Sequence, residues 1–286
     1  MSAALPASGA AARAHREGAA ALFVRTMLAR AYVRIIGSIR EPAFLISDAL
    51  FPTVGMAAYV LLYRALGAPK SFETLAVLGG VLATYWLNVL WGMGAQLYWE
   101  KQQGQLQLYF VAPCSRMAIL AGMALGGALA TTLRTMVALA VGIGILGVRI
   151  PSFHAGALLV VFVVSMTALY ALGMILASAF LLQGREAWHL ANALQEPVTF
   201  LSGLYFPLST FGMLGLAAAT LVPLGLGVDA LRQVLLGHAA RGMLSVRLEV
   251  GILAVLSVVL LWLARVSLEH LEMLSKREGR LTQRWQ

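Results

Sequence analysis

The sequence predicts an all-α polytopic membrane protein with six transmembrane helices, an amphipathic interfacial helix before them, and a re-entrant helical element between segments five and six. Three observations predict this class. Hydrophobic residues make up 60% of the 286 residues and charged residues only 12%, whereas soluble domains average about 25% charged residues. Several apolar runs reach the roughly 20 residues that a helix needs to cross a hydrocarbon core. The basic residues gather at the ends and in connecting segments, which is typical of membrane topology.

The first predicted elements lie before the membrane domain. Residues 1–18 are expected to form a flexible cytoplasmic N-terminus. Residues 19–41 show the three- and four-residue spacing of an amphipathic helix. Its apolar positions are Val24, Leu28, Ala31, Tyr32, Ile35 and Ile39. We expect this helix to lie in the cytoplasmic interface, with Arg30 and Arg34 on the opposite face available to anionic headgroups. A cytoplasmic helix packed on a partner is the alternative, and Pro42 ends the helix.

Six crossings are expected within a permease domain at residues 42–272, followed by a basic cytoplasmic tail at 273–286. Five apolar runs cross singly: Ala43–Leu66, Leu75–Leu97, Met117–Val148, Ala155–Leu182 and Leu248–Leu271. The run from Leu190 to Leu236 is too long for one helix and carries several glycines and prolines. Lipid does not tolerate unpaired backbone, so this run predicts one crossing to about Ser202 and then a re-entrant element at about 203–237.

The distribution of basic residues predicts that both ends face the cytoplasm, because cytoplasmic segments carry the excess of Lys and Arg. On the side of the termini lie Arg13, Arg16, Arg25, Arg30, Arg34, Arg40, Lys101, Arg116, Arg185, Lys276, Arg277, Arg280 and Arg284. On the other side lie Arg64, Lys70, Arg149, Arg232, Arg241 and Arg247. Arg134 and Arg265 fall within segments.

Several kinds of chemistry are excluded or disfavoured by residue content. A P-loop needs Gly-Lys followed by Ser or Thr, but the three lysines follow proline, glutamate and serine. Cys114 is the one cysteine, so no internal disulfide forms. Asp48 and Asp229 are the only aspartates, and the five histidines show no zinc or haem spacing. No metal site and no catalytic residues are therefore predicted.

Three charges fall inside apolar segments, where charges are costly and often functional. They are Asp48, Arg134 and Glu196. For Arg134, a structural ion pair, a contact on the substrate path and simple snorkelling all remain open. Proton-coupled transport usually needs more intramembrane carboxylates than these. Small residues recur every fourth position at Gly122, Gly126 and Ala130, which favours close helix packing over a gating role.

Two stretches carry more specific information. The first reads Tyr98-Trp99-Glu100-Lys101-Gln102-Gln103-Gly104-Gln105-Leu106-Gln107-Leu108, then Ala112-Pro113-Cys114-Ser115-Arg116. The second reads Phe200-Leu201-Ser202-Gly203-Leu204-Tyr205-Phe206-Pro207-Leu208, then Pro223 and Asp229-Ala230-Leu231-Arg232. In their order and spacing, over nearly the whole chain, these stretches resemble the type 2 ABC exporter permeases, the family of bacterial drug, antibiotic and lipid-linked polysaccharide exporters.

The resemblance implies a coupling helix at about 98–113 that docks on a separate ATPase subunit. The residues in the matching positions are Glu100, Lys101, Gly104, Gln105, Leu106, Leu108 and Pro113. Apolar Leu106, Leu108 and Phe110 would fill a groove of the partner, and Glu100 and Lys101 would orient the contact. An ordinary cytoplasmic loop is the alternative.

The same resemblance implies re-entrant pieces near the outer surface that form a gate. The matching residues are Ser202, Gly203, Phe206, Pro207, Pro223, Asp229 and Arg232. Gly203 and Pro207 would supply breaks in the backbone. Asp229 and Arg232, three residues apart, would form a local ion pair whose role is structural or gating.

By resemblance, the chain is the permease subunit of an ATP-driven exporter in the bacterial inner membrane. It would move an amphiphilic, drug-like or lipid-linked substrate by alternating access, as a homodimer with two ATPase copies and without nucleic acid. It would hold no cofactor, because ATP and magnesium bind the ATPase, and it would not itself be an enzyme. A secondary transporter or channel is the first alternative, and a membrane-embedded enzyme is the second.

Overall fold

The computed structural model describes residues 18–150, 154–183, 186–208, 212, 217, 222–237 and 242–278, and their regular structure is entirely helical. The helices are α2 (Ala19–Arg40), α3 (Pro42–Ala65), α4 (Lys70–Leu87), α5 (Gln96–Gln102), α6 (Leu106–Val111), α7 (Arg116–Ala140), α8 (Ala155–Gln183), α9 (Ala187–Leu201), α11 (Pro223–Leu236) and α12 (Val246–Glu278). Two π-helical segments, η1 (Asn88–Gly94) and η2 (Val141–Ile145), extend α4 and α7.

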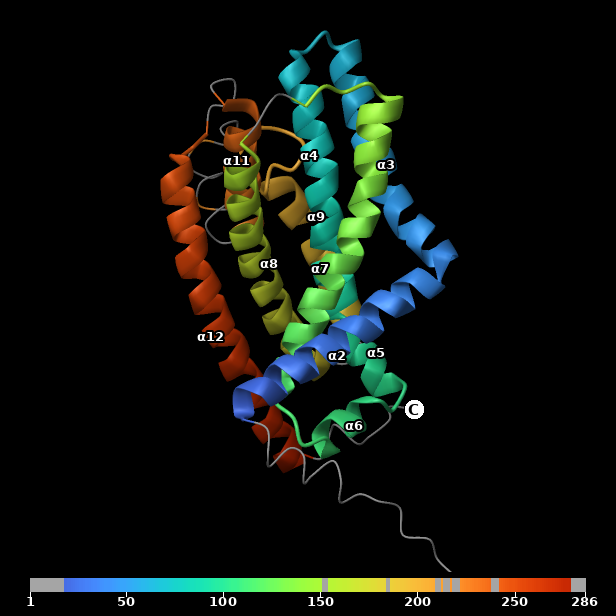
Figure 1. The fold of residues 1–286 in the computed structure, drawn as a ribbon, viewed down its shortest axis with the longest axis vertical. Coiled ribbons are helices and arrows are strands. Elements are labelled where there is room, and N and C mark those ends of the chain that lie inside the picture. The colour runs from blue at the N-terminus through green and yellow to red at the C-terminus, as the bar shows by residue number, and fades with distance from the viewer. Residues whose placement is uncertain are drawn as a thin grey trace, which may run out of the picture.

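The long helices form an upright bundle, and the short helices α5 and α6 lie at one end of it (Figure 1). Among the residues that the structure describes, five helical stretches are long and apolar enough to cross a membrane: Ile46–Ala65, Lys70–Gln102, Arg116–Ile145, Ala155–Leu181 and Val246–Leu271. They coincide with five of the six predicted crossings. The predicted fifth crossing is α9, whose 15 residues reach only about 22 Å at 1.5 Å per residue. Six crossings therefore stay a prediction.

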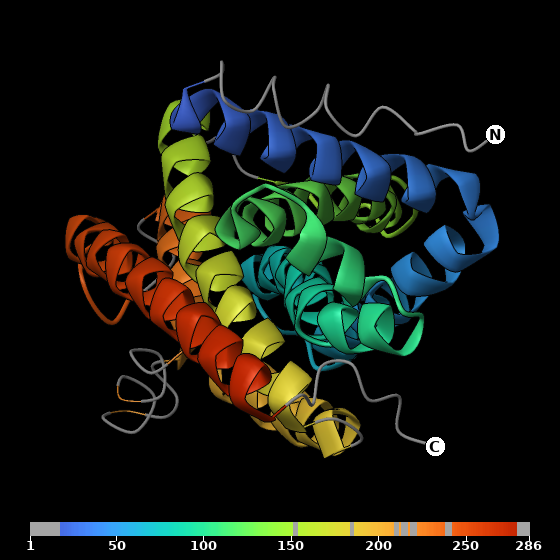
Figure 2. The ribbon, with the colours of Figure 1, turned by 90° about the horizontal axis from the view of Figure 1, so that it is seen from below.

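α4 runs through the centre of the bundle, and its continuation through η1 and α5 leads to the end at which α2 and α6 lie (Figures 1 and 2). Tyr85, Trp86 and Leu90 on this element are almost fully buried and belong to the main apolar core with Phe180 of α8. α8 and α12 pack along each other beside it. Burial of these large side chains fixes α4 in the core, and α5 continues it through η1.

α2 crosses the end of the bundle at a steep angle instead of joining it lengthwise (Figures 1 and 2). It packs on α7 at Gly122 and Gly126, where an added Cβ would lie 2.5 Å from the Met27 carbonyl oxygen and 2.9 Å from Ala31. The close packing predicted for these small residues is confirmed. The helix that packs on them is α2, which is not one of the candidate membrane-spanning stretches.

The predicted tails lie mostly outside the described residues. The structure describes nothing before Gly18 or after Glu278, so the expected N-terminus at 1–18 is represented by one residue. Of the predicted basic tail at 273–286, the described part continues α12. Parts of the predicted re-entrant region, 209–211, 213–216 and 218–221, also lie outside the described residues.

Candidate functional site

The predicted coupling element is a helical hairpin made of α5 and α6. Gly104 joins them with a φ of 76°, a left-handed conformation that glycine adopts without strain. The Gly104 amide donates to the Lys101 carbonyl, and the Gln105 amide donates to the Glu100 carbonyl at 2.9 Å. This is the Schellman pattern that ends many helices. The sequence therefore builds a tight turn at the end of the bundle, at the place where Gly104 was predicted to matter.

Glu100 holds this hairpin to α2. Its carboxylate forms an ion pair with the guanidinium of Arg30 and accepts a hydrogen bond from Gln96 at 2.9 Å. The Arg30 guanidinium lies 5.4 Å from the centroid of the Tyr109 ring on α6. Burial and the Glu100 carboxylate raise the pKa of Tyr109 to about 12. One cluster therefore joins α2, α5 and α6.

Arg34 repeats this arrangement one turn further along α2. Its guanidinium donates to the Gln96 side chain at 2.9 Å and to the Gly92 carbonyl. A Cβ at Gly92 would lie 2.7 Å from that guanidinium, so the missing side chain makes room for Arg34. Gly92 belongs to η1, and π-helical turns leave carbonyls that need other donors. Burial, with the nearby Arg30 charge, lowers the pKa of Arg34.

The expectation that Arg30 and Arg34 face lipid headgroups was wrong. Both arginines point into the protein. Four of the six predicted apolar positions point outward, since Val24, Leu28, Tyr32 and Ile39 are exposed, whereas Ala31 is buried and Ile35 is half-buried. The helical period separates two faces but does not say which one meets the protein. Here the buried polar groups on α5 and η1 bind the arginines.

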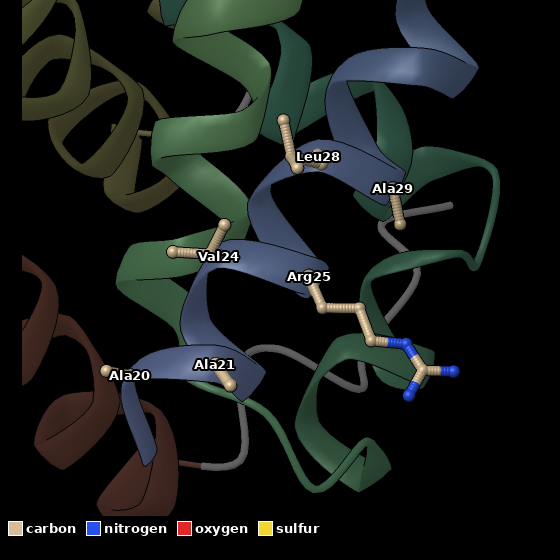
Figure 3. Close-up of a pocket in the computed structure, with 6 residues that line it drawn as sticks. All are labelled: Ala20, Ala21, Val24, Arg25, Leu28 and Ala29. Carbon is tan, nitrogen blue, oxygen red and sulfur yellow. The ribbon is translucent and has the colours of Figure 1, made fainter. Parts of the chain in front are cut away.

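The outward side of α2 carries a shallow, mainly apolar groove (Figure 3). Its lining residues are Ala20, Ala21, Val24, Arg25, Leu28 and Ala29. An exposed apolar surface on a helix that crosses the end of a membrane bundle suits the acyl–headgroup boundary. The orientation within the interface thus differs from the predicted one, and the interfacial placement itself stays a prediction.

The hairpin residues divide into an inner and an outer set. Leu106 is 4% exposed and belongs to the main core, and Glu100 and Lys101 are buried as well. Leu108 and Val111 are 68% and 83% exposed, and Gln105 and Pro113 are also exposed. The Phe110 side chain lies outside the described residues. Among the described side chains of α6, Leu108 and Val111 form the exposed apolar surface, which we call the hairpin patch.

Of the three intramembrane charges, two form a pair. The Arg134 guanidinium on α7 lies 3.0 Å from the Asp48 carboxylate on α3. Of the three alternatives for Arg134, the structure shows the ion pair. Glu196 on α9 is exposed, and among the described residues its carboxylate accepts a hydrogen bond only from its half-buried neighbour Gln195, at 3.0 Å. Other intramembrane polar contacts were missed because their residues are uncharged. The clearest is the Tyr170 hydroxyl, which donates to Asn88 at 3.0 Å.

Arg232 organises the predicted outer gate. From α11, its guanidinium donates to the carbonyl oxygens of Gly203, Leu204 and Phe206. Gly203 has a φ of 60°, so the backbone turns there, as its glycine predicted. The turn then packs on α3, where the Tyr205 ring stacks on Tyr59 at 4.2 Å between centroids. Arg232 replaces the hydrogen bonds that the backbone loses where α9 ends.

The expected ion pair between Asp229 and Arg232 is absent from the described residues. Asp229 instead accepts a hydrogen bond from the Met243 amide at 2.8 Å. Gln233, one turn on, donates to the Leu244 carbonyl and to Glu249 of α12 at 3.0 Å. Spacing along α11 could not show these partners. Met243 and Leu244 follow α11 in the chain, and Glu249 belongs to α12. Of the other predicted gate residues, Ser202 and Pro223 are buried, while Phe206 and Pro207 are half-buried.

We predict that the Arg30–Glu100 pair couples α2 to the hairpin energetically. Arg30→Met and Glu100→Gln should each lower thermal stability, and the double variant should lose about 1–3 kcal/mol less than the sum of the two. The measurement is the melting temperature of the purified protein in mild detergent. The exposed Arg265–Glu269 pair, 2.8 Å apart on α12, gives a control cycle with a coupling of about 0.5 kcal/mol or less. Equal coupling energies in the two cycles would contradict the proposed role of the Arg30–Glu100 pair in holding the hairpin to α2.

The fold and the site together define a multi-pass membrane protein that is helical over the described residues, with a hairpin fastened to α2 at one end and a backbone turn held by an arginine near the other. A family model described as ABC-2 type transporter matches residues 24–236. The chain belongs to this family, and it is therefore the membrane subunit of an ABC transporter. Members of the family generally pair with an ABC ATPase subunit. No curated protein matches the chain.

Proposed function

We propose that this protein is the permease of an ATP-driven exporter, working as a homodimer with two copies of a separate ATPase. The observation that carries the proposal is the hairpin patch. Leu108 and Val111 are exposed at the end of the bundle on a hairpin that Glu100 fastens to α2. Exposed apolar side chains on a rigid element are what a partner groove buries. The cytoplasmic ATPase is the partner that the family supplies.

The same hairpin offers a route by which a movement of the ATPase would reach the substrate path. α4, η1 and α5 form one continuous stretch from Lys70 to Gln102, and α4 lies in the core. The outer part of α4 contacts the turn held by Arg232, since a Cβ at Gly79 would lie 1.9 Å from the Leu204 carbonyl oxygen. Closure of the ATPases would tilt α5, and α4 would carry that tilt to the outer turn. This is alternating access through one rigid element.

α9 supports both the dimer and the class of substrate. Trp188, Asn192, Glu196 and Phe200 follow one another at four-residue spacing on its exposed face. A carboxylate at membrane depth is costly unless it is covered or lines a polar path. A second copy facing α9 would cover it and create a path with both aromatic and charged walls. Such walls suit an amphiphilic cargo, drug-like or lipid-linked, moving outward from the cytoplasm or inner leaflet.

Co-purification tests the proposal directly. The tagged protein, isolated from its native membranes in mild detergent, should retain a soluble subunit with Walker motifs and ATPase activity. The rigorously isolated chain should hydrolyse no ATP, because it has no Gly-Lys P-loop. Substrate movement that persists in vesicles without the ATPase and follows an ion gradient would instead establish a secondary transporter.

Cys114 tests the orientation. It directly follows the hairpin, so a membrane-impermeant maleimide should leave it unlabelled in intact cells and label it once the membrane is opened. Burial raises the pKa of this thiol. The thiolate reacts with maleimide, so labelling of opened membranes should accelerate as the pH is raised. Labelling from outside intact cells would overturn the topology and with it the ATPase contact.

A further inference from the structure

A second cavity lies away from the hairpin and from α9. It has a volume of about 500 Å³ and is lined by residues of α4, the end of α7, α8 and α11 and by Ile150. Its walls are aliphatic and aromatic side chains, among them Val81, Leu158 and Leu231. Thr74 is the polar exception among the lining residues, and its hydroxyl already donates to the Arg149 carbonyl at 3.2 Å. Among the lining side chains, the walls therefore offer a polar ligand no free donor and only the Thr74 hydroxyl oxygen as an acceptor.

The dimensions of this cavity match one chain of a lipid. From Thr74 to Leu82 its wall follows nine residues of α4, a rise of about 12 Å at 1.5 Å per residue step, and one leaflet of the hydrocarbon core is about 15 Å thick. Phe162 lines the cavity and packs edge-on against Tyr85, with ring centroids 5.4 Å apart. Leu159 on the α8 wall is exposed, so the cavity opens on the outer surface of the bundle. It is a groove parallel to the membrane-spanning helices.

Two cations stand at one end of this groove. Lys70, the first residue of α4, precedes Thr74 by one helical turn and shares its face. Arg149 adjoins the lining residue Ile150 and accepts the Thr74 hydrogen bond through its carbonyl. Both side chains are exposed. They lie at the ends of membrane-spanning helices, the level at which headgroup phosphates are found.

We propose that this groove binds one acyl chain of an anionic phospholipid from the leaflet opposite α2, with the headgroup held by Lys70 and Arg149. An apolar groove of leaflet depth, open to lipid and bordered by positive charge at one end, is complementary to that molecule in both shape and charge. A neutral phospholipid would fit the apolar groove but would bring no net negative charge to Lys70 and Arg149. The site does not depend on the ATPase or on the transported substrate.

Photolabelling in lipid nanodiscs tests the proposal. The full-length protein is placed in phosphatidylcholine nanodiscs that contain a small share of either phosphatidylglycerol or phosphatidylcholine with a diazirine on one acyl chain. After illumination, labelled peptides are mapped by mass spectrometry. We expect peptides that contain Val81 and Leu158 to carry several-fold more phosphatidylglycerol than phosphatidylcholine. Equal labelling by the two lipids would overturn the role of the cations.

Two sets of variants separate shape from charge. Leu158→Trp fills the groove and should abolish its labelling, whereas Val255→Trp, at an exposed position of α12, should not. Ala155→Phe at the groove mouth gives a second filled variant if Leu158→Trp fails to fold. The double variant Lys70→Gln/Arg149→Gln should keep the labelling but equalise the two lipids. Unchanged labelling in both filled variants, or crosslinks to a second protein copy at these peptides, would overturn the proposal without bearing on ATPase binding.

Discussion

Leu108→Asp should abolish retention of the ATPase while leaving the amount of permease in the membrane unchanged. Leu108 is 68% exposed in the free chain, so a carboxylate there remains hydrated and costs little before assembly. In the complex the same carboxylate would be buried without a partner, at a cost of about 3 kcal/mol or more, which weakens binding at least about 100-fold. Export should be lost with it. The measurement is ATPase retained per tagged permease in mild detergent.

Two controls bracket this experiment. Gln103→Asp introduces the same charge at an exposed polar position of the same hairpin and should retain the ATPase. Leu106→Asp places the charge in the core, since Leu106 is 4% exposed, and should lower the amount of permease itself. Normal ATPase retention and normal export by Leu108→Asp would show that the α5–α6 hairpin is only a loop, and the mechanism proposed for it would fail.

Arg232→Met should strongly destabilise the permease. Its guanidinium is buried and donates to the carbonyls of Gly203, Leu204 and Phe206. Methionine leaves these acceptors without that donor, and a buried unsatisfied polar group costs about 1–3 kcal/mol. We expect a loss of about 3–5 kcal/mol, or roughly 10 °C in melting temperature. The measurement is the temperature at which half of the detergent-solubilised protein leaves the monodisperse peak.

The matched control is Arg265→Met, which removes an exposed arginine from α12 and should change stability by about 0.5 kcal/mol or less. Arg232→Lys keeps the charge but loses the planar fork of donors, so it should fall between the wild type and Arg232→Met. If the melting temperature of Arg232→Met lies within about 2 °C of that of Arg265→Met, Arg232 does not hold the outer turn.

The apolar composition and the run lengths predicted the membrane class and five of the crossings, because a helix in lipid must satisfy its backbone within itself and show apolar side chains over its whole length. The left-handed turns at Gly104 and Gly203 were also predictable, since only glycine adopts that conformation without strain. For α9 the end was predicted at about Ser202, and the helix ends at Leu201. Its short length of 15 residues was not predicted. The missed contacts of Gln233 and Glu249 join residues from different helices.

By itself the sequence determined the class of protein, the family and the position of the α5–α6 hairpin for which we propose a coupling role, since each depends on local composition or on residues close together in the chain. Only the tertiary structure decided which faces are buried. It turned Arg30 and Arg34 inward, placed Leu106 in the core and left Leu108 exposed. The physical reason is that helical spacing defines faces but not their partners. Those partners, such as Glu100 for Arg30, come from helices that meet only after the chain has packed.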